Sequence, residues 1–313
     1  MTMLTGKTMG TYWQIKMPFL KQKNIKNIIQ NNLNKDENML SLWKKNSIVS
    51  QFNNNKKNIL QPINKKICQT IYNLLKINKK TEGKLDITAG SLINLWGFGN
   101  KKKLHHYPTN KEIKKEISLT GSKYLQLIYN VKGCYLQKKI NGIKINLSTI
   151  GEGFAVDHLS SVLHQYGIEN YIISVGGTIL VKVHPRQSKS KIIAIQTPTD
   201  IKQSVHLLVS LKNNAISTAG NYRNYYYLNN IRISHLIDPI NGKPIKHNLV
   251  SVSVIASSAL EADTWDTGLL ILGFKKAKKL AIQEKLAVCL IMKRKNHFYT
   301  WISPAFKKFI VQY

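Results

Sequence analysis

Three oxygen-bearing side chains are spaced so that they would share one face of a helix. In the segment E-A-D-T-W-D-T (261–267), Asp266 and Thr267 lie three and four residues after Asp263. Side chains with this spacing lie on the same face of a helix. Two carboxylates and a hydroxyl are hard oxygen donors of the kind that Mg²⁺ prefers. The segment indicates a divalent-cation site, and the competing interpretation is that the helix dipole alone favours acids there.

The same helix has a predicted start. The run S-A-L-E (258–261) matches a capping box, in which Ser258 and Glu261 would satisfy the first backbone N–H groups. We therefore expect a structural role for Glu261, in contrast to the acids that follow it.

A histidine that could move a proton lies in S-H-L-I-D-P-I-N-G (234–242). An unperturbed imidazole has a pKa of about 6.5, so His235 could act as a general base near neutral pH. A lone histidine is also compatible with a purely structural role. Asp238 begins the sequence Asp-Pro-Ile-Asn-Gly, which is good turn chemistry on its own.

Two glycine-containing segments could bring backbone N–H groups to a phosphate. I-G-E-G-F (150–154) opens a predicted helix, and Gly176-Gly177 ends a predicted buried strand. The hydroxyl-rich run A-I-S-T-A-G (215–220) is compatible with a ligand site or with an ordinary strand. The residues together favour phosphoryl chemistry with a hard metal and one histidine. The sequence contains no serine-hydrolase elbow, zinc pattern or RNA-binding aromatic motif.

The elements that must position these residues alternate irregularly between strand and helix. This pattern predicts one α+β domain over residues 1–313. Predicted helices cover 25–43, 63–77 and 152–166, with further helices starting near 258 and 275. The segment 86–99 is too rich in glycine for a regular helix. Predicted strands cover 9–17, 123–129, 134–140, 143–147, 171–175, 178–184, 191–196, 205–211, 231–235, 248–256, 286–292 and 297–301.

The composition excludes several classes of protein. The 313 residues are 43% hydrophobic, which excludes a disordered chain. The formal net charge of +32 suggests a polyanion partner, but only 4 of the 47 basic residues are Arg, the residue that reads phosphates and bases geometrically. Lys clusters at 101–103, 111–115 and 275–279. We therefore interpret the charge as a solvated surface, and we expect no nucleic-acid partner.

Three cysteines, Cys68, Cys134 and Cys289, are far apart in the sequence and odd in number. We expect buried or idle thiols in place of a disulfide framework or a CxxC metal pair. No stretch approaches the ~20 apolar residues of a membrane span, and the first residues lack a secretory h-region.

Eight colinear segments resemble the ApbE family of flavin transferases, and together they span nearly the whole chain. They are K-T-M-G-T-Y-W (7–13), L-S-L-W (40–43), D-I-T-A-G-S-L-I-N-L-W-G-F-G (86–99), N-L-S-T-I-G-E-G-F-A-V-D (146–157), S-V-G-G (174–177), I-S-T-A-G-N-Y-R-N-Y-Y (216–226), S-H-L-I-D-P-I-N-G-K-P-I (234–245) and S-V-S-V-I-A-S-S-A-L-E-A-D-T-W-D-T-G-L (251–269).

The resemblance implies an ApbE-like, T-fold-like domain that transfers FMN from FAD to a threonine of a target protein and releases AMP. The expected target is a subunit of a membrane redox pump, and the expected cofactor is Mg²⁺. By motif, His235 is the expected catalytic residue. The implied FAD contacts are Met9, Trp43, Lys84, Leu85, Asp86, Asn146, Glu152 and Ile237, and the implied metal site is Thr149, Asp263, Asp266 and Thr267.

Asn146 departs from the family pattern, which has Asp before Leu147-Ser148. Asn keeps one acceptor but loses the charge, so we expect weaker FAD binding or slower turnover. Two other functions stay open: a hydrolase that uses the same site with water as acceptor and splits FAD to FMN and AMP, and a non-catalytic FAD-binding protein, which Asn146 makes plausible. The resemblance also implies a periplasmic location, with the cytoplasm as the alternative because the chain shows no export signal.

Overall fold

The computed structural model describes residues 2–18, 24–99, 104–186, 189–201, 203–295 and 297–311. The Lys run at 101–103 lies outside these residues. The chain forms two compact units, each made of separate segments. Unit 1 comprises residues 1–37, 149–223 and 248–313, and unit 2 comprises 38–148 and 224–247. The α+β class is confirmed, whereas the single domain over 1–313 stays a prediction. No helix among the described residues is long and apolar enough to cross a membrane.

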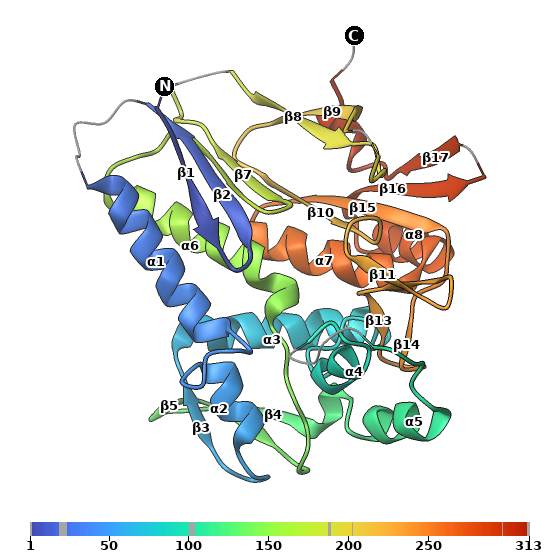
Figure 1. The fold of residues 1–313 in the computed structure, drawn as a ribbon. Helices are drawn as coiled ribbons and strands as arrows, with labels where there is room; N and C mark the ends of the chain where they lie inside the picture. The colour runs from blue at the N-terminus through green and yellow to red at the C-terminus, as the bar shows by residue number, and fades with distance from the viewer. Residues whose placement is uncertain are drawn as a thin grey trace. The chain divides into compact units, whose positions relative to one another are not determined.

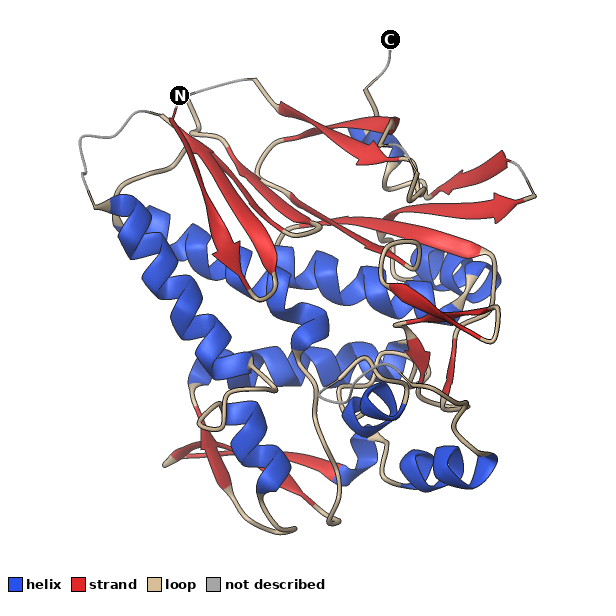
Figure 2. Ribbon diagram, in the orientation of Figure 1, coloured by secondary structure: helices blue, strands red, loops and turns tan. Residues whose placement is uncertain are grey.

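Unit 1 is built on an eight-stranded sheet in which every neighbouring pair is antiparallel (Figure 2). Its order is β1-β2-β6-β7-β10-β15-β16-β17. The strands are β1 (Thr2–Thr8), β2 (Thr11–Met17), β6 (Tyr171–Val175), β7 (Thr178–Lys182), β10 (Ala215–Gly220), β15 (Leu249–Ala256), β16 (Ala287–Arg294) and β17 (His297–Ile302).

Helices cover one face of this sheet because alternate strand residues are apolar on that side. The helices α6 (Gly151–Gln165), α7 (Ala259–Leu272) and α1 (Ile25–Leu40) lie along this face (Figure 1). Ile173 and Leu180 pack in one apolar cluster with residues of α6, of α7 and of the first turns of α1. Ile172 and Ile179 point to the other face, under the hairpin β8–β9 and the short helix η3. That hairpin is β8 (Lys191–Gln196) and β9 (Val205–Leu211), η3 is Lys307–Phe309, and α8 (Phe274–Gln283) packs on β16.

Unit 2 has a small three-stranded sheet of order β3-β5-β4 and two short hairpins. A separate apolar cluster joins Trp96 and Ile113 to Tyr226, Ile233 and Ile237. The elements are α2 (Ile48–Asn54), β3 (Gln61–Ile63), α3 (Lys65–Lys80), α4 (Gly90–Leu95), α5 (Asn110–Ser118), β4 (Leu125–Asn130), β5 (Gly133–Lys138), β11 (Tyr225–Leu228), β12 (Ile231–Ser234), β13 (Ile237–Asp238) and β14 (Lys243–Pro244).

The cysteine prediction is wrong for two of the three residues. Cys68 on α3 and Cys134 on β5 form a disulfide across 66 residues of sequence, with Cα atoms 6.1 Å apart. Only the packing of α3 on β5 brings the two sulfurs together, so spacing in the sequence could not show it. Cys289 is a free, buried thiol, and its burial raises its pKa to about 12.

Several predicted elements also differ from the observed ones. The predicted strand at 143–147 is absent, and only Lys144 makes an isolated bridge, to Ala89. Part of 86–99 is helical after all, as the short helix α4. Helix α5 was missed although Thr109 and Glu112 form a complete capping box there, because its lysine-rich sequence hides the periodicity. Strand β1 and helix α2 were also missed.

Lys138 is a buried cation in unit 2. Its side chain is 1% exposed, and its Nζ donates hydrogen bonds to the carbonyl oxygens of Ile143 (3.1 Å) and Asn53 (3.3 Å). The Nζ also lies 4.7 Å from the ring centroid of Phe52. Burial, assisted by the charge of Lys144, lowers the pKa of Lys138 to about 8. Carbonyls and a ring do not supply a full counter-charge, so the fold disfavours the proton on this amine.

This depressed pKa predicts a stability that rises with pH. Between pH 8 and about 10.5 the unfolded chain keeps the Lys138 proton while the folded chain has lost it, so raising the pH favours folding. The slope is up to about 1.4 kcal/mol per pH unit. Urea unfolding of wild type and Lys138→Met at pH 8, 9 and 10 measures the effect. We expect the wild type to gain about 2 kcal/mol relative to the variant. A constant difference across this range would contradict the assignment.

Candidate active site

Helix α7 is held at its first turn by a side chain from α6. The carboxylate of Asp157 accepts hydrogen bonds from the backbone N–H groups of Ala259 (2.8 Å) and Leu260 (2.9 Å). Ser258 is the N-cap, and its hydroxyl accepts from the N–H of Glu261 at 3.2 Å. These contacts satisfy N–H groups that the helix itself leaves without acceptors. They fix where α7 starts relative to α6.

The predicted capping box is only half formed. Ser258 caps the helix as expected, but the carboxylate of Glu261 accepts a hydrogen bond from the Ser257 hydroxyl (3.1 Å). Glu261 is exposed, whereas Asp263 and Asp266 after it are buried.

The predicted metal residues of α7 share one buried face. Asp263 is 7% exposed, Asp266 1% and Thr267 8%. One oxygen of Asp263 accepts from the backbone N–H of Gly153 on α6 (2.8 Å), and the Thr267 hydroxyl donates to Asp266 (3.2 Å). The hydroxyl of Ser217 on β10 lowers the pKa of both carboxyl groups, against the larger effect of burial, which raises it.

Glycine at position 153 is a steric requirement. A Cβ atom there would lie 2.6 Å from the carbonyl oxygen of Ala259 and 2.8 Å from the Cβ of Asp263. No side chain fits between the two helix backbones at this distance. The second glycine of I-G-E-G-F therefore lets α6 and α7 approach closely enough for the Gly153 N–H to reach Asp263.

The two aspartates form an acidic pair without a cation. Burial raises the pKa of each carboxyl well above its ordinary value, and the charge of Asp266 raises that of Asp263 further. No ion pair in the described part of the chain involves either group. Buried carboxylates this close together are stabilised when a cation neutralises them. Two carboxylates and the Thr267 hydroxyl fit a small oxygen-preferring cation such as Mg²⁺.

The aspartates alone supply few ligands for a metal ion. Among residues with a described placement, no three His, Cys, Asp or Glu side chains converge as a metal cluster. A cation here would therefore depend on hydroxyl, backbone, substrate or water oxygens besides Asp263 and Asp266, which is usual for Mg²⁺. Thr149, the remaining predicted ligand, is in the short helix η2 (Ser148–Ile150), directly before α6.

Two predicted FAD contacts lie near each other in unit 1: Glu152 in the first turn of α6, and Met9 in the turn between β1 and β2. The Glu152 carboxylate accepts from the N–H of Gly177 (2.7 Å), and its charge acts on Asp263 and Asp266. Met9 is in the β1–β2 turn with a φ of 49°, an uncommon conformation for a non-glycine residue. Its sulfur lies 3.2 Å from where a Cβ of Gly151 would be.

His235 lies in unit 2, directly after β12. Its Nδ1 is 2.9 Å from the carbonyl oxygen of Asn224. A carbonyl only accepts, so Nδ1 carries the proton and Nε2 has the free lone pair of a base. Burial lowers the pKa of His235, opposed by the Asn224 hydrogen bond and assisted by the charge of Arg232. The imidazole is therefore neutral at pH 7. The edge of Phe98 packs against it, with ring centroids 6.2 Å apart.

The side chains of the predicted FAD segment 84–86 are engaged in contacts within the protein. Lys84 forms an ion pair with Asp238 (2.6 Å), and Leu85 is buried. Asp86 accepts hydrogen bonds from the Thr88 N–H (2.8 Å) and hydroxyl (2.6 Å), and burial raises its pKa. Lys84 and Asp86 therefore stabilise the conformation of this segment. Asp238, which the sequence assigned to a turn, also pairs with Lys84.

Asn146 is also engaged locally. It is 7% exposed, and its Oδ1 accepts hydrogen bonds from the N–H (2.9 Å) and hydroxyl of Ser148. An aspartate oxygen could accept the same bonds, so the missing charge does not disturb this turn. The effect of Asn146 on FAD binding stays a prediction.

The last two predicted FAD contacts are both in unit 2 and differ in exposure. Trp43 is 65% exposed, so its ring is available to stack on a planar ligand. Ile237 is 4% exposed and belongs to the apolar cluster around Trp96. The predicted residues thus fall into two sets, Met9, Thr149, Glu152, Asp263, Asp266 and Thr267 in unit 1, and Trp43, Lys84, Leu85, Asp86, Asn146, His235 and Ile237 in unit 2.

Sequence reasoning missed three residues around the acidic pair. The Gly153 N–H donates to Asp263, Asp157 holds the start of α7, and the Ser217 hydroxyl lowers the pKa of both aspartates. Ser217 stands in the run A-I-S-T-A-G, whose hydroxyls were noted without a role. Asp157 follows the glycine segment I-G-E-G-F. The sequence could have pointed to it because acidic residues are scarce in this chain, which has only 15.

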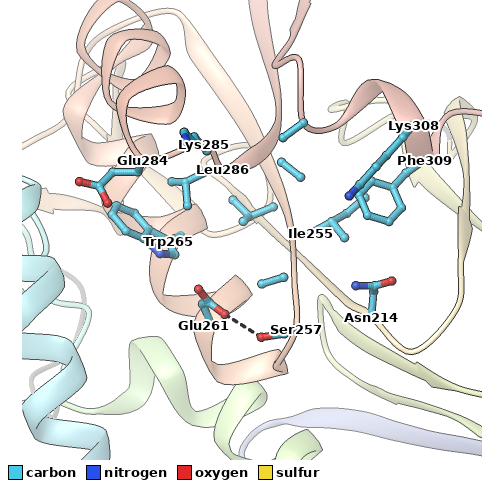
Figure 3. A pocket seen from close by; sticks show the side chains of 14 residues that line it. Asn214, Ile255, Ser257, Glu261, Trp265, Glu284, Lys285, Leu286, Lys308 and Phe309 are labelled. Atoms are coloured by element: carbon cyan, nitrogen blue, oxygen red, sulfur yellow. Dashed lines mark hydrogen bonds between the residues drawn. The ribbon is translucent and has the colours of Figure 1, made fainter.

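One described cavity of about 330 Å³ lies on the other side of α7 (Figure 3). Trp265 and Glu261 of α7 line it, together with Ile255, Leu286 and Phe309. Residues 261 and 265 are about one helical turn apart and face away from Asp263 and Asp266. No residue that the sequence assigns to FAD or metal lines this cavity.

Comparisons with known proteins show the family of this chain. The ApbE family model matches residues 9–290. The "FAD:protein FMN transferase" of Buchnera aphidicola subsp. Schizaphis graminum is 64% identical, covering 98% of this chain and 91% of the relative. The protein of that name from Escherichia coli K12 is 43% identical, covering 99% and 89%. The solved structure of the flavin transferase ApbE from Vibrio cholerae superposes with a TM-score of 0.87, at 32% identity and 98% coverage of both chains. The chain therefore belongs to the ApbE family and is a transferase.

Proposed function

We propose that this protein transfers FMN from FAD to a threonine hydroxyl of a target protein, with Mg²⁺ as cofactor and AMP as the second product. The observation that carries the proposal is the buried pair Asp263 and Asp266, which has a hydroxyl beside it and no cationic partner in the described residues. The names of the relatives support the donor and the transferred group.

In the proposed reaction the threonine oxygen bonds to the FMN-side phosphorus of FAD, and the bond from that phosphorus to the bridging oxygen breaks. AMP leaves with the bridging oxygen. A bound Mg²⁺ would offset the negative charge on the pyrophosphate and on the leaving group. Such reactions depend mainly on positioning and charge stabilisation.

The residues of this chain have separate tasks in that scheme. Asp263, Asp266, Thr267 and Thr149 would hold the cation. The Nε2 of His235 would accept the threonine proton, which fits an imidazole that is neutral at pH 7 and fixed through Nδ1. The exposed ring of Trp43 would stack on a planar ring of FAD.

The target is proposed to be a subunit of a membrane redox pump, and the protein is proposed to work in the periplasm. The Cys68–Cys134 disulfide supports an oxidising compartment, because structural disulfides are rare in reducing cytosol. Peptide mapping without reductant on protein from its native host would show the linked pair, whereas two free thiols would argue for the cytoplasm.

Asp263→Ala should abolish metal-dependent transfer while leaving the protein folded, because it removes a cation ligand from a buried face. We expect AMP release and the FMN mass increment on the target to fall at least ~100-fold. Glu261→Ala is the matched control, since it removes an exposed acid from the same helix and should transfer normally. Wild-type activity in Asp263→Ala would show that the metal assignment is wrong.

His235→Ala should lower the rate of transfer about 10²–10⁴-fold, which is the usual contribution of a general base. FAD affinity, measured by fluorescence quenching, should stay at the wild-type value. The rate of the wild type should fall at acidic pH as His235 becomes protonated, and this acidic limb should vanish in the variant. His184→Ala, at a surface histidine near Glu169, is the control. Wild-type kinetics in His235→Ala would rule out the base.

Asn146→Asp should strengthen FAD binding or raise turnover about fivefold, since a hydrogen bond to a charged group is worth about 1 kcal/mol more than a neutral one. The local turn should survive, because aspartate can accept from Ser148 as Asn146 does. Asn230→Asp makes the same charge change at an exposed turn and should have no effect. If FAD affinity and turnover are both unchanged in Asn146→Asp, the missing charge is irrelevant.

A further inference from the structure

Two helices of unit 1, α6 and α7, cap each other. Asp157 of α6 accepts hydrogen bonds from the first N–H groups of α7, at Ala259 (2.8 Å) and Leu260 (2.9 Å). In the other direction, Asp263 of α7 accepts from the N–H of Gly153 in the first turn of α6 (2.8 Å). The first N–H groups of a helix have no acceptor within that helix. Each helix therefore supplies an aspartate to the first turn of the other.

The spacing of these contacts fixes the register between the two helices. Asp157 comes four residues after Gly153, and Ala259 comes four residues before Asp263, which is about one turn on each helix. The two contacts are therefore about one turn apart on both helices and follow in opposite order along them. A slide of either helix along the other would disturb both contacts together.

The two groups that cap α7 differ in what they hold. Ser258 is local, because its hydroxyl accepts from the Glu261 N–H (3.2 Å) within the same segment. It stabilises the helix without fixing where the helix lies. Asp157 comes from another helix, so its contact ties the start of α7 to α6. On α6 the N-cap residue Ile150 has an apolar side chain that cannot accept a hydrogen bond, and Asp263 supplies an acceptor there.

Asp263 has a second task besides capping α6. Its Oδ2 accepts from the Gly153 N–H, which fixes the direction of the carboxyl group. The other oxygen, Oδ1, would be offered to the divalent cation of the proposed site. Protein groups that hold a metal ligand by hydrogen bonds in this way orient its lone pairs toward the metal. The orientation of Asp263 thus depends on the contact between the two helices.

We propose that Asp157 is a positioning residue for the divalent-cation site: by holding the start of α7 on α6, it keeps Asp263 in the orientation that binds the cation. This inference rests on the proposed metal site and adds to it a carboxylate that would touch neither the cation nor FAD. Loss of Asp157 should therefore weaken cation binding although every ligand is still present.

The first measurement is the affinity of the full chain for Mn²⁺ alone, without FAD, by electron paramagnetic resonance. We expect Asp157→Ala to bind about 10-fold more weakly than wild type, at the lower end of the effect of groups that orient metal ligands. Asp157→Asn keeps one acceptor oxygen and should weaken binding about threefold. Ser258→Ala is the matched control, since it removes a cap from the same helix but leaves the contact with α6. It should bind Mn²⁺ within about twofold of wild type.

Amide hydrogen exchange at Gly153 tests the same contact without any metal. Because this N–H lies in the first turn of α6, the Asp263 carboxylate is the acceptor that protects it from exchange. If Asp157 keeps Asp263 in place, the Gly153 amide should exchange about fivefold faster in Asp157→Ala than in Ser258→Ala. Equal exchange in the two variants would show that Asp157 does not fix Asp263.

The outcomes separate this inference from the proposed function. If Asp263→Ala loses Mn²⁺ while Asp157→Ala binds it as the wild type does, Asp157 has no positioning role and the metal site stands. If Asp157→Ala and Ser258→Ala weaken binding equally, fraying of α7 explains the effect and the inference fails. If Asp157→Ala does not fold, Asp157→Asn decides, and wild-type affinity there overturns the inference. If the wild type itself binds no Mn²⁺, the proposed metal site is wrong and the inference falls with it.

Discussion

The contact between the Asp157 carboxylate and the first N–H groups of α7 is the constraint on which the acidic site of unit 1 depends. It joins a negative charge to the positive end of a helix dipole, a contact worth about 0.3–2 kcal/mol. Its larger effect is geometric, because it sets where α7 begins beside α6. The Gly153 N–H then reaches Asp263 at 2.8 Å. A glycine is needed at 153 because the two backbones are too close for any side chain.

The acidic pair is unfavourable to the fold on its own. Burial raises the pKa of both carboxyls, and the charge of Glu152 raises both further, so the folded chain without a cation holds them at an energetic cost. Functional sites commonly carry such costs, which the rest of the structure offsets. The net charge of +32 does little to relieve them, since charges in water are screened beyond about 8–10 Å. In this chain the few acids carry more functional information than the many lysines.

The parts of the fold that sequence reasoning predicted correctly are those with strong local signals. Helix α7 begins at its Ser cap, and α6 ends at Gln165, close to Gly167. The buried strand at 171–175 was found because a short apolar run stops at a glycine pair. The predicted strand at 143–147 failed for a physical reason. Alternating apolar residues there fill the core of unit 2, but the backbone pairs only once, at Lys144. Alternating apolar residues indicate which side chains are buried. A β-strand also requires a neighbouring strand with which its backbone can form hydrogen bonds.

The sequence by itself determined which chemical groups each segment carries and on which face of its helix or strand they lie. The spacing of Asp263, Asp266 and Thr267 places them together because helical periodicity is a local property. Only the tertiary structure decided which groups meet that face. Gly153 lies 110 residues from Asp263, and Cys68 lies 66 residues from Cys134, and no local rule relates either pair. Such pairings arise from how α6 packs on α7 and α3 on β5. The long-range packing of the whole chain therefore selected the partners of residues whose types the sequence had already specified.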